Sequence, residues 1–160
     1  MDKINKNSLF VLFVWVLLII FISIKSFSQN PQTEKIKYVQ IGDTKVKVEL
    51  AITEEARARG LSEKKRLKGD EGMLFVFERP GIYPFWMKSM KFPIDIIWIV
   101  PDEMGAEGDL RMVYIKKNAT PGSYPETFAP DVEAKYVLEV VSGFSDENNL
   151  KVGDRVELSY

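Results

Sequence analysis

The chain has 160 residues, of which 46% are hydrophobic and 28% are charged, and its formal net charge is −1. This composition is that of a folded protein, and the length leaves room for one domain and an appendage. The sequence contains no Cys and no His, which excludes disulfides, His- or Cys-ligated metal sites, Cys–His dyads and Ser–His–Asp triads. Carboxylate, Lys, Tyr or Ser–Lys chemistry stays open, as does a protein without catalysis.

The charge distribution argues against a nucleic-acid partner. The first 28 residues contain three lysines and one aspartate, which leaves 19 basic and 22 acidic residues, a net charge of −3, for the rest of the chain. Nucleic-acid binders usually carry a basic stripe, and electrostatic attachment to anionic lipid needs clustered Lys and Arg. We therefore expect membrane contact only through the N-terminal segment.

An apolar run, Leu9–Ile24, follows Lys3 and Lys6 and ends at Lys25. As a helix this run would span about 24 Å, which is short for a hydrocarbon core of about 30 Å and slightly long for a signal-peptide core. Both a cleaved signal peptide and an uncleaved signal anchor therefore fit residues 1–28, with residues 9–24 as the hydrophobic helix. A polar segment, residues 29–36, is expected to be a linker.

The location of the remaining domain, residues 37–160, follows from the same segment. Basic residues flank the N-terminal side of the apolar run and mark that side as the one retained in the cytoplasm. Ser26 and Ser28 also occupy the −3 and −1 positions of a cleavage site before Gln29. We expect an extracytoplasmic domain, either periplasmic, secreted, or anchored to the outer face of the inner membrane.

The domain begins with a predicted strand and a predicted short helix. In Lys45–Ile52 apolar residues fall on every second position, which is typical of a half-buried antiparallel strand. Thr53 then precedes two acidic residues, two arginines and Gly60. This is the order of an N-cap, a first turn, a last turn and a C-terminal cap, and it predicts a helix between Thr53 and Gly60.

The rest of the domain is predicted to be mainly β. Gly72–Phe77 and Ile94–Val100 are apolar on both faces, apart from Asp95, and this pattern indicates central strands covered on both sides. Further strands are expected at Leu110–Ile115, Tyr136–Val141 and Arg155–Leu158, with a hairpin loop at 101–109 and a long irregular connection at 120–131. The elements predict a compact β-sandwich or a partly open barrel, preceded by the N-terminal hydrophobic helix.

Two acidic residues interrupt apolar strand faces and are therefore candidate site residues. Asp95 would share a face with Ile97 and Ile99, and Glu139 lies between Val137 and Val141. A buried carboxylate costs several kcal/mol unless it is paired or hydrogen-bonded. Asp95 is therefore expected either to pair with Lys88 or Arg59 or to bond backbone N–H groups of the preceding loop, or alternatively to be the acid of a pocket.

Three further residues are candidates for ligand binding. Trp86 lies in an aromatic cluster next to a loop, where it either packs in the core or stacks on a ligand. Arg59 ends the predicted helix and has a guanidinium that suits a carboxylate partner, and Lys88 follows the aromatic cluster. Together with Asp95 and Glu139 these bases would make one charge network, either a buried structure or the floor of a site.

The order of several motifs resembles a known family, DUF192. The motifs are Arg59-Gly60-Leu61, Gly72–Phe77, Phe85–Lys88, Pro93–Ile97, Tyr136–Val140 with Gly143, and Gly153-Asp154, and the resemblance covers about Val46 to Leu158. The chain departs from the family's usual pattern at Ser62-Glu63 and at Ser89-Met90. The resemblance implies a compact β-rich fold, often behind a signal or anchor segment, and it supplies no catalytic residue.

Three functions remain open on the sequence. The first is a non-enzymatic module that binds a small molecule, glycan or protein. The second is a hydrolase or lyase with Asp95 and Glu139 as acid and base, which needs carboxylates about 5–9 Å apart across an open cleft. The third is a docking protein with a large exposed apolar patch and no pocket. No cofactor is expected, and the acidic loop at 102–109 does not match a calcium-binding EF-hand.

Overall fold

The computed structural model of the protein describes residues 15, 33–102 and 109–160. The chain divides into two compact units, Met1–Pro31 and Gln32–Tyr160. The predicted signal peptide or anchor, apart from residue 15, lies outside the described residues, as do residues 29–32 of the predicted linker. Within the described part of the chain, no helix has both the length and the apolar character needed to cross a membrane.

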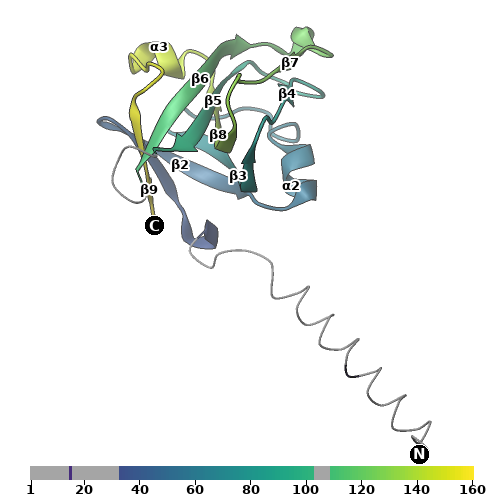
Figure 1. The fold of residues 1–160 in the computed structure, drawn as a ribbon. Coiled ribbons are helices and arrows are strands. Elements are labelled where there is room, and N and C mark those ends of the chain that lie inside the picture. The colour runs from purple at the N-terminus through teal and green to yellow at the C-terminus, as the bar shows by residue number, and fades with distance from the viewer. Residues whose placement is uncertain (1–14, 16–32, 103–108) are drawn as a thin grey trace, which may run out of the picture. The chain divides into compact units, whose positions relative to one another are not determined.

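Seven strands of the second unit form a closed barrel (Figure 1). In their order around the barrel they are β1 (Tyr38–Ile41), β2 (Thr44–Ala51), β3 (Glu71–Gly81), β8 (Ala134–Val141), β5 (Ile94–Pro101), β6 (Leu110–Ala119) and β9 (Arg155–Ser159). Neighbouring strands are antiparallel, except that β2 and β3 are parallel. The connection between this parallel pair contains the helix α2 (Glu54–Arg59).

A smaller layer lies outside the barrel. It contains the two-stranded sheet of β4 (Phe85–Trp86) and β7 (Thr127–Phe128), which are antiparallel to each other. The remaining elements are the short helix α3 (Phe144–Glu147) and two 3-10 turns, η1 (Thr33–Lys35) and η2 (Pro121–Ser123). The long connection predicted at residues 120–131 therefore contains η2 and β7.

The local signals that predicted β2 and α2 are confirmed. Buried and exposed residues alternate along β2, with Val46 and Val48 inside the barrel core. The hydroxyl of Thr53 accepts a hydrogen bond of 3.1 Å from the backbone N–H of Ala56 and caps the helix. At the other end Gly60 has φ +51° and ψ −137°, a conformation that is essentially restricted to glycine.

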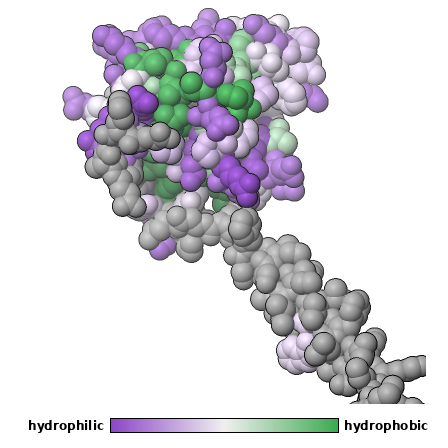
Figure 2. All heavy atoms as spheres, viewed as in Figure 1, coloured by the Kyte–Doolittle hydropathy of each residue, from purple (hydrophilic) through white to green (hydrophobic). Residues whose placement is uncertain are grey.

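Two apolar layers explain why β3 and β5 are hydrophobic on both faces. One face contributes to the barrel interior, as Leu74 and Ile97 do. The other face contributes to a second cluster between the barrel and the outer layer, as Phe75 and Trp98 do. In Figure 2 hydrophobic residues reach the surface over the region of β5 and β6. Both faces of the sheet are therefore buried at β3 and β5, as predicted for central strands that are covered on both sides.

The mainly β class and the short helix are confirmed, but the barrel is closed. Neither a sandwich nor a partly open barrel describes it, because β1 pairs with β9 and joins the first strand to the last. The sequence analysis did not predict β1, β4, β7 or α3. It also ended the sixth strand at Ile115, whereas β6 continues to Ala119.

Candidate functional site

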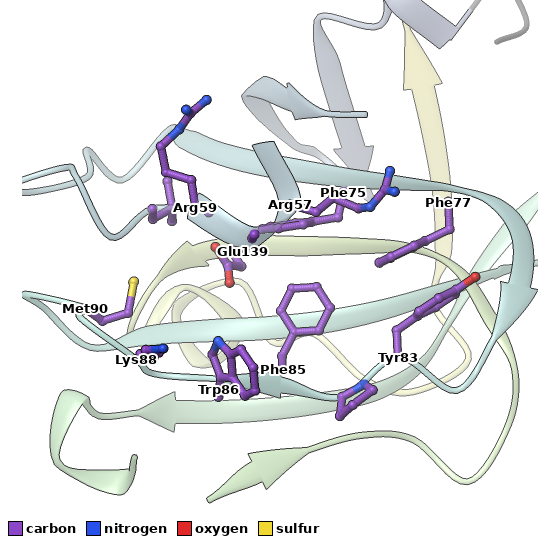
Figure 3. Close-up of a pocket in the computed structure, with 14 residues that line it drawn as sticks. Arg57, Arg59, Phe75, Phe77, Tyr83, Phe85, Trp86, Lys88, Met90 and Glu139 are labelled. Carbon is purple, nitrogen blue, oxygen red and sulfur yellow. The ribbon is translucent and has the colours of Figure 1, made fainter. Parts of the chain in front are cut away.

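A pocket of about 180 Å³ lies on the outside of the barrel, between α2, the end of β3 and the segment around β4 (Figure 3). Its wall is mostly aromatic and apolar, its floor contains one carboxyl group, and three basic residues line it. The residues are Arg57, Ala58, Arg59, Gly60, Leu61, Phe75, Phe77, Tyr83, Pro84, Phe85, Trp86, Lys88, Met90 and Glu139.

The aromatic wall is held in place by contacts among the rings themselves. Phe85 meets Phe75 edge-to-face at a centroid distance of 4.8 Å and an interplanar angle of 82°. Tyr83 stacks on Phe77 at 3.5 Å with an angle of 8°. Trp86 is half exposed at the edge of the pocket, with 52% of its surface accessible. Because rings packed in this way have little freedom to move, the wall is formed before any ligand arrives.

Glu139 supplies the carboxyl group of the floor. It lies on β8, the central strand of the three that underlie the pocket, and its cross-strand neighbours are Met73 on β3 and Ile96 on β5. Directly opposite residues of neighbouring strands point to the same face, so the flanking side chains are apolar. Only 4% of the residue's surface is exposed.

The Glu139 carboxyl has no protein partner. It makes no hydrogen bond or ion pair with any described residue, and its Oε2 is buried without a donor. Burial raises the pKa of this carboxyl to about 8, because removal from water penalises the charged form. In Figure 3 the carboxyl lies between α2 and β4 and points into the pocket. A buried polar group without a partner is rare in proteins, and here it faces a cavity.

The three basic residues of the pocket differ in their contacts. Arg57 donates from Nη1 to the carbonyl oxygens of Ile52, at 2.7 Å, and Val76, at 3.3 Å, so it is part of the framework. Arg59 is exposed, forms an ion pair of 3.7 Å with Glu63, and points its guanidinium away from Glu139 (Figure 3). Lys88 is exposed and makes no hydrogen bond or ion pair within the described part of the chain.

Asp95 lies on the opposite face of the sheet from Glu139. It is opposite Val140 in the β5–β8 ladder, whereas Glu139 is opposite Ile96, so the two carboxyl groups point to different sides. Asp95 accepts backbone hydrogen bonds from Asn118 at 2.8 Å, Gly143 at 3.4 Å and Ser145 at 2.9 Å. The donors belong to the end of β6 and the start of α3, and not to the loop before β5 as predicted, so the carboxylate ties these two later segments to β5.

The structure brings together four of the five candidate residues. Arg59, Trp86, Lys88 and Glu139 line the pocket, and Asp95 does not. No single network of the four charged candidates forms, because Asp95 bonds backbone groups and Glu139 has no partner. Among the described residues, no group of three or more acidic side chains is placed to hold a metal ion.

Several pocket residues were missed by the sequence analysis. Arg57 was read only as a helix-end base, and Phe77 and Tyr83 were not considered as part of a site. No local pattern predicted the role of Arg57, because the carbonyl groups that it bonds, those of Ile52 before α2 and of Val76 on β3, lie outside the helix. No local pattern indicated that Phe77 and Tyr83 stack, because the chain turns between them.

The fold and the pocket together define a class of protein, a small closed β-barrel with a lateral, mostly aromatic cavity. Residues 37–158 match the model of the DUF192 family, described as an uncharacterized ACR, and the chain belongs to this family. The match confirms the resemblance carried by the ordered motifs. No curated protein matches the chain.

Two solved structures share the fold. One is the crystal structure of a "putative transcription regulator" from Sinorhizobium meliloti 1021, with 28% identity, a TM-score of 0.66, and coverage of 76% of this chain and 90% of that one. The other is a protein of unknown function from Novosphingobium aromaticivorans DSM 12444, with 27% identity, a TM-score of 0.67, and coverage of 81% of this chain and 99% of that one.

The arrangement does not support the hydrolase or lyase hypothesis. That hypothesis needs Asp95 and Glu139 on either side of one cleft. The two carboxyl groups instead lie on opposite faces of the sheet, and only Glu139 reaches the pocket. The docking hypothesis, which expected no pocket, does not account for the cavity beside α2.

Proposed function

We propose that the barrel domain is a non-enzymatic binding module that takes a small molecule in the pocket beside α2. The observation that carries this proposal is the Glu139 carboxyl, which is buried, unpaired and directed into a preformed aromatic cavity. An unsatisfied buried polar group costs about 1–3 kcal/mol of stability. A ligand that hydrogen-bonds to Glu139 would offset this cost, whereas a purely structural carboxyl would have a partner from the protein.

The size of the pocket limits the ligand to about one ring. An apolar cavity of about 150 Å³ accommodates benzene, and this pocket measures about 180 Å³. Drug-sized ligands usually occupy larger pockets, from about 300 Å³ upward. The pocket therefore suits a single-ring molecule, or one ring of a larger molecule whose remainder stays in solvent.

The proposal includes a place of action outside the cytoplasm. The supporting observation is the apolar run Leu9–Ile24 behind Lys3 and Lys6, with small residues before Gln29. In that setting the partner is a compound met outside the cytoplasm, and the chain contacts a membrane only through residues 9–24. Mass spectrometry of the exported protein tests this part. A chain that starts near Gln29 indicates a cleaved signal peptide, and an intact membrane-bound chain indicates an anchor.

The pocket is tested by obstructing it. Ala58 is exposed on α2 and lines the cavity, so Ala58→Trp fills the space without removing a contact of the fold. Glu54→Trp on the same helix is the matched control, because Glu54 is exposed and does not line the pocket. Single-ring compounds are screened against the full-length chain by protein-observed NMR. The proposal expects hits that Ala58→Trp abolishes and Glu54→Trp retains, and hits insensitive to Ala58→Trp would contradict it.

A further inference from the structure

We infer that the ligand of this pocket is a single-ring organic anion, bound by an O–H donor from Glu139 at the floor and by the ammonium group of Lys88 at the edge. This inference rests on the proposed function, because it names the chemical class of the molecule that the pocket takes. Three separate features support it: the aromatic wall, the distribution of charge around the cavity, and the protonation state of the floor carboxyl.

The aromatic wall favours a flat ring. Five aromatic side chains line the cavity, namely Phe75, Phe77, Tyr83, Phe85 and Trp86. Aromatic rings gain most from edge-to-face or offset contacts with another ring. The half-exposed indole of Trp86 lies beside Phe85 on β4 (Figure 3) and offers such a contact at the entrance.

The charged side chains that line the pocket together with Glu139 come from α2 and from the segment after β4. The helix α2 contributes Arg57 and Arg59, and the segment after β4 contributes Lys88. Tyr83, before β4, contributes a phenol ring to the wall. The underlying strands β3 and β5 place the apolar residues Met73 and Ile96 beside Glu139. Among the residues that the structure describes, no acid other than Glu139 lines the cavity.

This distribution selects an anion over a cation. Arg59 already pairs with Glu63, and Arg57 donates to two carbonyl groups. Lys88 has no partner among the described residues, so its ammonium group is available to a ligand. A bound cation would meet the like charge of Lys88, whereas a bound anion would meet an opposite charge there.

The floor carboxyl is compatible with an anion because burial keeps it protonated. With the pKa of Glu139 raised to about 8, about nine in ten of these carboxyl groups carry a proton at pH 7. A neutral carboxyl donates an O–H, and a hydrogen bond from an O–H to a carboxylate is among the short, strong kinds. An ionised Glu139 would instead repel an anion and attract a cation. The affinity for an anion should therefore fall as Glu139 loses its proton.

The test uses three probes of nearly equal shape and different charge: benzoate, benzamide and benzamidinium. Their binding to the full-length chain is measured by protein-observed NMR titration at pH 7 and pH 9. The inference expects benzoate to bind most tightly at pH 7 and benzamidinium least. It expects the affinity for benzoate to fall by about tenfold between pH 7 and pH 9, following the protonated fraction. Acetate, which has the charge but no ring, should bind far more weakly than benzoate.

Two variants separate the roles of the polar residues. Glu139→Gln keeps a neutral donor of the same shape, so benzoate should still bind and its pH dependence between 7 and 9 should vanish. Lys88→Gln should lower the affinity for benzoate by about two- to fivefold, as expected for the loss of an exposed charge pair. The affinity for benzamide, which has no charge, should not change. Ala58→Trp should abolish binding of every probe, and Glu54→Trp should not.

The outcomes distinguish the inference from the proposed function. Benzamide or benzamidinium binding more tightly than benzoate, with sensitivity to Ala58→Trp, would overturn the inference and leave the binding module intact. An affinity for benzoate that stays constant between pH 7 and pH 9 in the wild type would show that the Glu139 carboxyl does not donate to the anion, and would overturn the inference in the same way. If none of the probes binds and the single-ring screen gives no hit, both the inference and the proposed function are overturned.

Discussion

The carboxylate of Asp95 on β5 accepts a hydrogen bond of 2.9 Å from the backbone N–H of Ser145, 50 residues further along the chain. Two more backbone groups, the N–H of Asn118 and that of Gly143, donate to the same side chain. Ser145 and Gly143 lie at the start of α3, where N–H groups lack helical partners. One buried acid therefore satisfies donors from two segments that are remote in sequence.

Replacement of Asp95 should destabilise the domain strongly. Asp95→Ala leaves buried N–H groups without acceptors, and each such group costs about 1–3 kcal/mol. We expect the free energy of unfolding to fall by about 3 kcal/mol or more, measured by urea denaturation. Asp131→Ala, at an exposed position in a loop, is the control and should change stability by less than about 0.5 kcal/mol. Equal effects of the two substitutions would contradict the structural role of Asp95.

The stability of the protein should depend on pH through Glu139. Folding raises the pKa of this carboxyl from 4.5 to about 8, so between these values the folded state holds a proton that the unfolded chain has released. The contribution of the protonated Glu139 carboxyl to the free energy of unfolding is fully present below pH 4.5. It is lost as the pH rises through 8. Across this window the free energy of unfolding falls by on the order of 5 kcal/mol, at about 1.4 kcal/mol per pH unit.

The variant Glu139→Gln isolates this effect because it cannot ionise. Its free energy of unfolding should be close to that of the wild type at pH 4 and clearly larger at pH 9. Urea denaturation at several pH values gives the two curves, with Glu63→Gln at an exposed position as the control. Curves that run parallel over the whole range would show that the carboxyl is not protonated by folding.

Substitution of Gly60 should cost stability at the edge of the pocket. Gly60 has φ +51°, and a Cβ at this position would lie 3.4 Å from Cζ of Phe75 and 3.8 Å from Oε2 of Glu139. We expect Gly60→Ala to lower the free energy of unfolding by about 1–3 kcal/mol, the usual cost of such backbone strain. Gly69→Ala, where no atom lies within 4 Å and no positive φ is required, should be nearly neutral in thermal denaturation. A neutral Gly60→Ala would mean that α2 ends in another conformation.

The two arginines at the end of α2 should differ in importance. Arg57 bonds two carbonyl groups and lies over the ring of Phe77 at 5.2 Å, so Arg57→Ala should cost about 2 kcal/mol, as expected for hydrogen bonds to a charged group. Arg59 has an exposed ion pair with Glu63, and Arg59→Ala should cost less than about 0.5 kcal/mol. Chemical denaturation measures the free energy of unfolding of both variants. A larger loss of stability in Arg59→Ala than in Arg57→Ala would contradict this prediction.

Local patterns predicted the elements that depend on local chemistry. The alternation along β2 and the caps Thr53 and Gly60 are signals of a few neighbouring residues, and these elements form where expected. The barrel closure depends instead on pairing between β1 and β9, which are more than a hundred residues apart. A four-residue strand such as β1 has too few positions to show a period of two, so its partner was not foreseen.

The candidate site also depends on contacts between distant segments, which local sequence patterns do not predict. Asp95 and Glu139 each interrupt an apolar strand face, and the sequence treats them alike. Their difference arises from what covers each face: loops that bring N–H donors cover Asp95, and an aromatic cavity covers Glu139. The periodicity of a strand says which residues share a face, but it does not say which part of the chain packs on that face.

The pairing of β1 with β9 sets the order in which the domain can mature. Of the barrel strands β1 comes first in the sequence and β9 comes last, so Tyr38–Ile41 keeps one unpaired edge until Arg155–Ser159 joins it. Exposed strand edges invite association with other chains, and contacts between distant segments form slowly. The contact that closes the barrel thus joins two strands that lie far apart in the sequence, and deletion of Arg155–Ser159 would leave the edge of β1 unpaired.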